Sequence, residues 1–105
     1  MTNSNVNERR RRKRIPFEAP ASVTADQQSM SASTKDISER GLFIFVDGAF
    51  QTGCEIDVLL TVPEGLGLDV SGVICCHGRV IRSDSVGGQH GIAVQIDRYA
   101  QVPQV

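Results

Sequence analysis

The sequence is poor in the residues and patterns that define several large classes of protein. Among its 105 residues there is no Trp, one Tyr, four Phe and three Cys. No apolar stretch is long enough to form a membrane-spanning helix. The first residues lack the apolar region of a signal peptide, and no lipidation motif is present. We therefore expect one small domain that resides in the cytoplasm.

The cysteines argue against a disulfide framework, because their number is odd and Cys75 and Cys76 are adjacent. The spacing of Cys75, Cys76 and His77 fits no zinc pattern, and neighbouring residues on a strand point to opposite faces. Buried apolar cysteine is the expected role of this pair. The sequence assigns no function to Cys54, and it predicts neither a metal site nor a cofactor.

Signals for an enzyme are also missing, since no site combines an acid, a base and a nucleophile. A triad of Ser38, His90 and an Asp has no nucleophile elbow to support it. The run Gly65-Leu66-Gly67 is a turn and not a phosphate loop, because the Lys and helix that should follow are absent. His77 and His90 are expected at the surface or in loops.

Charge, in contrast, is abundant and unevenly distributed. The net charge is −1, yet residues 9–14 read Arg-Arg-Arg-Arg-Lys-Arg and hold six of the eleven basic side chains. The remainder of the chain keeps five basic against twelve acidic side chains, a net of −7. A basic segment of this kind attracts phosphate, nucleic acid or an anionic membrane surface.

The polar residues 1–8 are expected to be a disordered tail, and the chain after the basic run is typical of an all-β protein. No segment shows helical periodicity over three turns. Short segments rich in branched residues alternate with turns, which favours an antiparallel barrel or sandwich. Strands are predicted at Ala21–Ala25, Ser29–Asp36, Gly41–Asp47, Glu55–Val62, Asp69–Arg82 (as one strand or two) and Gly91–Asp97. Turns are predicted at 26–28 and 63–65, and a glycine-rich loop at Ser83–Gln89. Gly72 and Gly78 are possible bends or bulges within the strand region 69–82.

Pairing of the first two strands would bring two polar segments together. Pro16 favours an extended arm over residues 9–16 that runs into the first strand. A hairpin that turns near Gln27 would set Phe17 opposite Ile37 and Arg14 near Arg40. The basic arm would then lie beside the loop 36–41.

The residues of this loop suit recognition of a nucleotide. Asp36 and Ser38 are two apart, so on extended backbone they face outward while Ile37 enters the core. A carboxylate accepts paired N–H donors such as those of a guanine edge, and Gly41 allows positive φ or close approach of a ligand. The alternative is an ordinary Asx or Ser turn.

The arm supplies the complementary chemistry. Arg10 and Arg14 are four residues apart, and each presents a planar guanidinium that pairs with phosphate or guanine and stacks on bases. The alternatives are a solvated basic tail and a non-specific nucleic-acid arm.

The combined pattern resembles the PilZ domain, a bacterial receptor family for cyclic di-GMP, over about residues 8–97. An Arg-x-x-x-Arg element (Arg10, Arg14) precedes the first strand, and Asp36-x-Ser38-x-x-Gly41 follows about 20 residues later. Gly78-Arg79-Val80-Ile81-Arg82 and Gly91–Ile96 complete the pattern.

The resemblance implies a six-stranded antiparallel β-barrel, of about residues 17–97 within a domain 9–105, with a flexible basic N-terminal arm. Cyclic di-GMP would be bound by Arg10, Arg14, Asp36, Ser38 and Gly41. Arg9 would accompany binding of a stacked ligand dimer. The arm would close over the ligand, and the protein would signal by contact with an unidentified effector protein, in a process such as motility or biofilm formation. A helix after the last strand, common in such domains, is not expected in Arg98–Val105, which Pro103 interrupts.

Two other functions remain compatible with the residues. A degenerate member of the family would bind only protein partners, although such members usually lose the motif residues that are present here. A basic-arm nucleic-acid binder would show a steep dependence on salt and no preference for a cyclic dinucleotide.

Overall fold

The structure is a computed structural model that describes residues 14–103 of the chain. Within that range the chain forms seven strands and no helix. The strands are β1 (Ile15–Pro16), β2 (Pro20–Ala25), β3 (Gln28–Ile37), β4 (Gly41–Val46), β5 (Glu55–Val62), β6 (Gly72–Val86) and β7 (Gln89–Gln101). The predicted tail, residues 1–8, and residues 9–13 of the predicted arm lie outside the described residues.

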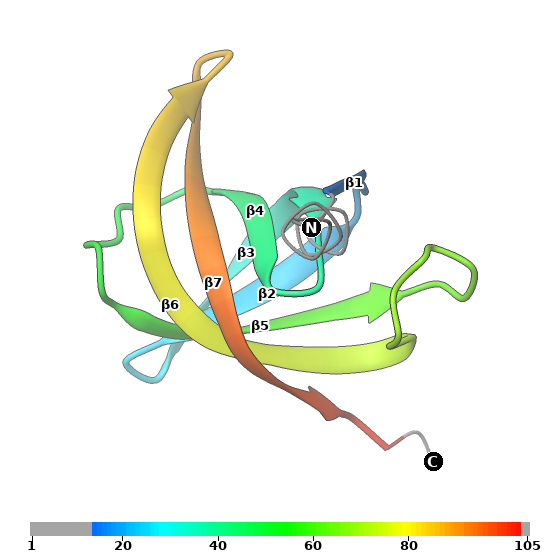
Figure 1. The fold of residues 1–105 in the computed structure, drawn as a ribbon. Coiled ribbons are helices and arrows are strands. Elements are labelled where there is room, and N and C mark those ends of the chain that lie inside the picture. Colours follow the sequence, from blue (N-terminus) through cyan, green and yellow to red (C-terminus); the bar gives the residue numbers. More distant parts are fainter. Residues whose placement is uncertain (1–13, 104–105) are drawn as a thin grey trace, which may run out of the picture.

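All neighbouring strands pair antiparallel, and the sheet closes on itself (Figure 1). The order β3-β2-β5-β6-β7-β4 returns to its start because β4 also pairs with β3. β1 is an additional short strand on the edge of β3. The predicted six-stranded antiparallel β-barrel is therefore confirmed. No helix within residues 14–103 has the length and apolar character needed to cross a membrane.

The core follows from the alternation that the sequence contains. In β5, Ile56, Val58, Leu60 and Val62 are buried, and the residues between them are exposed or half-buried. Matching inward side chains on the other strands fill the barrel, among them Val23, Ile37, Ile44, Ile74, Val80 and Ile92. Burial of each such side chain contributes about 1.5–3 kcal/mol to the stability of the barrel.

The β2–β3 hairpin corrects the predicted register. Its turn is two residues long, with Asp26 and Gln27 both at positive φ, which matches the right-handed twist of the flanking strands. Gln28 already belongs to β3. Ile15, and not Phe17, lies opposite Ile37. The predicted pairing of the arm with β3 is therefore wrong by two residues. The hairpin turn is shorter than predicted, and residues 17–19, which lie between β1 and β2, interrupt the pairing with β3.

Three predicted boundaries were wrong near the C-terminal end. The loop predicted at Ser83–Gln89 is a tight turn at Gly87 and Gly88, which both have positive φ, so the β6–β7 hairpin is longer than expected. β6 begins at Gly72 instead of Asp69. β7 continues beyond Asp97 to Gln101, because β6 offers it pairing partners down to Ile74. A register shift beside Gly78 confirms the predicted irregularity there.

The aromatic pair on β4 faces away from the barrel interior. Leu42, Ile44 and Val46 occupy the core face, whereas Phe43 and Phe45 share the other face and pack edge to face, with ring centroids 5.8 Å apart. Phe43 is nevertheless buried, and its ring lies against Gly91, where an added Cβ would overlap it.

Cys75 and Cys76 point to opposite faces of β6, as predicted, but only Cys76 is buried. Burial raises the pKa of the Cys76 thiol to about 12. Cys76 therefore keeps its proton well above the pH at which an unfolded thiol ionises, and the reactive thiolate is scarce in the native protein. We expect iodoacetamide near pH 8 to label Cys54 and Cys75, which are both half-buried, and to spare Cys76 until the protein is denatured. Peptide mass spectrometry measures this, and native labelling of Cys76 at the rate of Cys54 would contradict it.

The side chain of Thr34 links β3 to residues 17–19, the segment before β2, through hydrogen bonds. Its hydroxyl is buried, donates to the carbonyl of Phe17 and accepts from the N–H of Ala19 at 2.9 Å. Thr34→Val keeps the shape but leaves these backbone groups without their partner, so we expect a loss of about 1–3 kcal/mol in the free energy of unfolding by urea. Thr24→Val is the matched control, because the Thr24 hydroxyl bonds only Ser29 in an exposed position. An equal effect of both substitutions would be evidence against the role of Thr34.

Candidate functional site

A β-bulge in β3 sets the direction of the loop residues. The pairing of β3 with β4 shifts between Thr34 and Asp36, so that Lys35 is the extra residue. Met30, Ala32 and Thr34 face the core side, and strict alternation would place Asp36 there as well. The bulge instead turns Ile37 into the core, where it is fully buried, and leaves Asp36 at the surface.

Asp36 lies between two cations. Its carboxylate accepts a hydrogen bond from the guanidinium of Arg14 and lies 3.3 Å from the ammonium of Lys35. Lys35 in turn lies over the Phe43 ring, 5.7 Å from its centroid. The side chain of Arg14 is 43% exposed and that of Asp36 only 14%, so the arginine is the more accessible member of the pair. Sequence reasoning placed Arg14 near Arg40, and the pair with Asp36 results from the corrected register.

Ser38 and Gly41 form the two ends of a tight turn. The Ser38 N–H donates to the Gly41 carbonyl at 2.8 Å, and the Ser38 hydroxyl lies 3.4 Å from the same oxygen. Ser38 is 5% exposed, so the prediction that its hydroxyl faces outward like Asp36 was wrong: the turn folds it inward. A Cβ at Gly41 would lie 3.2 Å from Nη2 of Arg14 and 3.3 Å from Oγ of Ser38. Gly41 thus leaves room for these two side chains and has no positive φ, and its close approach to a ligand stays a prediction.

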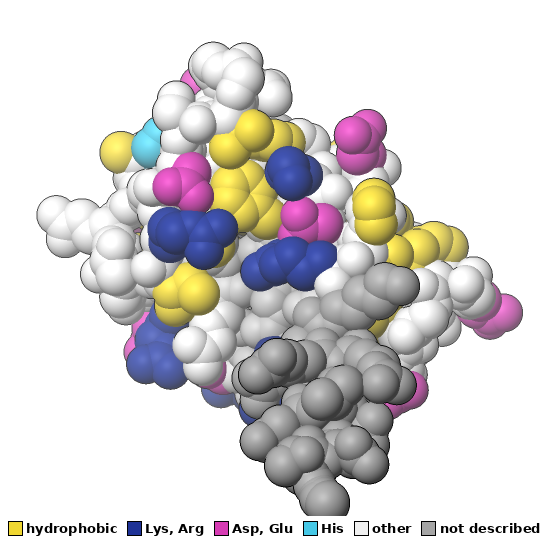
Figure 2. All heavy atoms as spheres, turned by 45° about the horizontal axis from the view of Figure 1, so that its top comes forward, with side chains coloured by type: hydrophobic (Ala, Val, Ile, Leu, Met, Phe, Trp, Pro, Cys, Tyr) yellow, Lys and Arg dark blue, Asp and Glu magenta, His cyan; other side chains and the backbone are white. Residues whose placement is uncertain are grey.

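These residues line one hollow, which we call the Arg14 pocket. Its volume is about 350 Å³, and its lining comes from the end of the arm, the β3–β4 turn, β6 and β7. The lining residues are Arg14, Ser38, Arg40, Gly41, Ile81, Val94 and Gln95. Figure 2 shows the face of the barrel that includes β1 and β4, where basic and acidic side chains gather around a hydrophobic patch. Two guanidinium groups and no carboxylate line this pocket, so it favours an anion.

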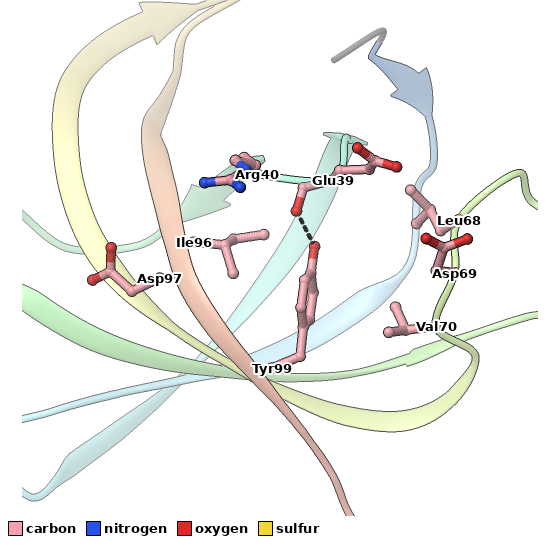
Figure 3. Close-up of a pocket in the computed structure, with 8 residues that line it drawn as sticks. All are labelled: Glu39, Arg40, Leu68, Asp69, Val70, Ile96, Asp97 and Tyr99. Atoms are coloured by element: carbon pink, nitrogen blue, oxygen red, sulfur yellow. Dashed lines mark hydrogen bonds between the residues drawn. The ribbon is translucent and has the colours of Figure 1, made fainter. Parts of the chain in front are cut away.

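A second hollow of about 390 Å³ opens on the other side of the turn, at the mouth of the barrel (Figure 3). Its floor is formed by Leu68, Val70, Ile96 and the ring of Tyr99, and three carboxylates, of Glu39, Asp69 and Asp97, stand around it. These carboxylates repel an anion, although Asp97 is paired with Arg79 at 3.5 Å. A third, polar groove of about 550 Å³ lies between β3, β4 and the β6–β7 turn and has no basic lining residue except His90. The Arg14 pocket is therefore the better anion site.

Tyr99 connects β7 to the β3–β4 turn. Its hydroxyl donates to the Glu39 carbonyl at 2.7 Å, and Figure 3 shows the ring reaching from β7 to the turn. Burial raises the pKa of the phenol to about 12, so the hydroxyl keeps its proton to a higher pH than an exposed tyrosine. The side chains of Glu39 and Arg40 leave the turn in opposite directions (Figure 3), which gives Arg40 access to both hollows.

The structure brings together four of the six predicted site residues. Arg14, Ser38 and Gly41 line one pocket, and Asp36 is bonded to Arg14 at its edge. Arg9 and Arg10 lie outside the described residues. Sequence reasoning missed Gln95, Ile81 and the role of Tyr99. The sequence of β6 gives no clear signal for Ile81, because the strand also contains the apolar run Val73-Ile74-Cys75-Cys76.

The fold is a small closed β-barrel, and a pocket lined by Arg14 and Arg40 lies beside its β3–β4 turn. Comparison with known families gives a match to the PilZ domain over residues 8–103. The chain belongs to the PilZ domain family. No curated protein matches the sequence significantly.

Membership places the chain among non-enzymatic receptor modules whose ligand is cyclic di-GMP. This family binds the dinucleotide itself and uses no organic cofactor. Among residues 14–103, no group of three or more His, Cys, Asp and Glu side chains is arranged to hold a metal ion.

Proposed function

We propose that this protein binds cyclic di-GMP in the Arg14 pocket and uses the bound state to signal to another protein. The observation that carries the proposal is the junction of Arg14 with the β3–β4 turn, because it joins a phosphate-binding guanidinium to the groups that suit a guanine edge. Two predicted ligand motifs, 22 residues apart at Arg14 and Asp36, meet at one bonded pair.

Each residue has a role that follows from its chemistry. Arg14, with Arg10 of the arm, pairs with phosphate oxygens and stacks on a guanine face. Asp36 accepts the N1 and N2 hydrogens of a guanine edge, and its present bond to Arg14 orients the carboxylate. Ser38 and Gly41 shape the turn, and Gly41 leaves room for the guanidinium. Arg9 supports a second, stacked ligand molecule.

The proposed signal is a change in the arm. Six adjacent positive charges repel one another, and two ligand phosphates would neutralise part of that charge and let residues 9–13 close over the pocket. Ordering costs roughly 1–2 kcal/mol per residue, and charge-assisted hydrogen bonds of about 1.5–3 kcal/mol each offset it for a short arm. The closed arm then presents a surface for the effector protein. Trypsin cleavage within the arm that is equally fast with and without saturating ligand would refute this step.

Titration calorimetry of the full chain with cyclic di-GMP tests the proposal, with GTP as the control ligand. We expect saturable binding of cyclic di-GMP and none of GTP at the same concentration. Two ligands per chain for the wild type and one for Arg9→Ala would support the stacked dimer. A folded protein that binds no cyclic di-GMP would overturn the proposal in favour of a module that binds only protein. Equal binding of unrelated nucleic acids, with a steep salt dependence, would favour a nucleic-acid binder.

A further inference from the structure

An exposed isoleucine in the Arg14 pocket has no structural reason to be apolar. Ile81 is 47% exposed, and with Leu59 at 43% it is one of two exposed large hydrophobic side chains within the described residues. Leu59 lies on β5 and lines none of the three hollows, whereas Ile81 shares a pocket with Arg14 and Arg40. An apolar side chain among guanidinium groups does nothing for a simple anion, so it points to a ligand that also has an apolar surface.

The backbone turns Ile81 toward this pocket by a bulge. In β6, Val80 pairs with Val94 and Arg82 pairs with Ala93, so Ile81 is the extra residue without a partner on β7. A bulge lets two successive residues escape strict alternation, and it re-aims a side chain next to a site. Val80 fills the core and is fully buried, while Ile81 and Arg82 are both exposed. The core therefore does not require an apolar residue at position 81.

The groups around Ile81 supply the rest of a base-binding surface. Gln95, exposed on β7, pairs with Gly41 on one side and with Arg79 on the other, and it lines the same pocket. Its amide offers one acceptor and two donors to the edge of a base. Ile81 lines the pocket from β6 and Arg14 lines it from the residue before β1, so a flat ring can lie against the isoleucine while its phosphate reaches the guanidinium.

We infer that Ile81 is a specificity-determining residue that packs against the face of a purine base of the bound dinucleotide. It makes the pocket select a nucleotide over inorganic phosphate or pyrophosphate, which satisfy the arginines but leave the isoleucine exposed to water. The inference rests on the proposed function, and it places the base of the ligand against the side of the Arg14 pocket that β6 and β7 form.

The first experiment is calorimetric titration of full-length variants with cyclic di-GMP. Ile81→Ala removes the apolar contact, and burial of about half an isoleucine side chain corresponds to a roughly five- to tenfold loss of affinity. Ile81→Val retains most of the contact and should bind within about threefold of the wild type. The matched control is Leu59→Ala, which removes an equally exposed side chain from β5 and should leave the affinity unchanged.

A second measurement detects the contact itself. In protein labelled at the isoleucine δ1 methyl groups, stacking on a purine should shift the Ile81 resonance upfield and give a nuclear Overhauser effect to the guanine H8 proton. The resonance of Ile74, which is buried in the core, serves as the internal control.

The outcomes separate the inference from the proposed function. Wild-type protein that binds no cyclic di-GMP overturns both. Wild-type binding together with unchanged affinity of Ile81→Ala and an unshifted Ile81 methyl at saturation overturns only the inference. A five- to tenfold loss with Ile81→Ala, retention with Ile81→Val and the Overhauser contact establish it.

Discussion

Arg14→Ala is expected to weaken binding of cyclic di-GMP by at least about a hundredfold. Arg14 is the cation at the centre of the site: it bonds Asp36, lines the Arg14 pocket and approaches Gly41. Two charge-assisted hydrogen bonds to phosphate contribute about 1.5–3 kcal/mol each, and their joint loss of about 3 kcal/mol or more corresponds to that factor. Calorimetric titration of the variant beside the wild type measures it.

Two further variants distinguish lost geometry from lost charge. Arg14→Lys keeps the charge but not the planar guanidinium, so we expect an intermediate affinity. Arg98→Ala removes an exposed arginine of β7 that lines none of the three hollows, and it should bind like the wild type. If Arg14→Ala and Arg98→Ala weaken binding equally, the arginines act only through overall charge and the proposed site is wrong.

Gly78→Ala is expected to lower the free energy of unfolding by about 3 kcal/mol or more. A Cβ at Gly78 would overlap the carbonyl oxygen of Gln95 and lie 3.1 Å from Cγ1 of Val94. The carbonyl belongs to the backbone of β7, which is held by β6 on one side and β4 on the other, so it has no room to move away. Overpacking a rigid position costs about 1–3 kcal/mol and occasionally more, which should reduce Tm by roughly 12 °C or more in a domain of this size.

Gly48→Ala is the matched control for this substitution. Its added Cβ would meet only the flexible end of Met30, at 3.4 Å from the sulfur. We therefore expect a change in Tm of no more than a few degrees. Thermal and urea unfolding followed by circular dichroism measure both variants. Similar melting temperatures for the two would show that β6 and β7 separate easily at Gly78, contrary to the packing described above.

Local sequence patterns predicted the strands with the cleanest alternation. β5 was predicted over its full length, Glu55–Val62, because inward and outward side chains alternate without interruption. β4 was predicted to within one residue because Gly41–Asp47 is rich in aromatic and branched residues. The ends of β6 and β7 that meet at their shared turn were not predicted. Ser83–Val86 is mostly polar, and a pair of glycines is as common in a tight hairpin turn as in a longer loop.

The sequence also predicted most of the candidate site, because its chemistry depends on residue type. The arginines of residues 9–14 are cationic in any conformation. Asp36 and Ser38 lie at the end of a predicted strand and offer hydrogen-bond acceptors at that position. The residues that complete the pocket were not predicted, since Ile81 and Gln95 are ordinary strand residues until the barrel closes and places them beside Arg14.

The sequence by itself determined the class of fold, the family pattern and the positive charge of the segment 9–14, because alternation, turn residues and arginine content are local properties of the chain. Only the tertiary structure decided which side chain meets which. The bulges at Lys35 and Ile81 each insert one residue into a strand, and such an insertion reverses the face of every residue that follows it. Their positions depend on the pairing of distant strands around a closed barrel. The pair of Arg14 with Asp36, the inward position of Ser38 and the exposure of Ile81 follow from that pairing.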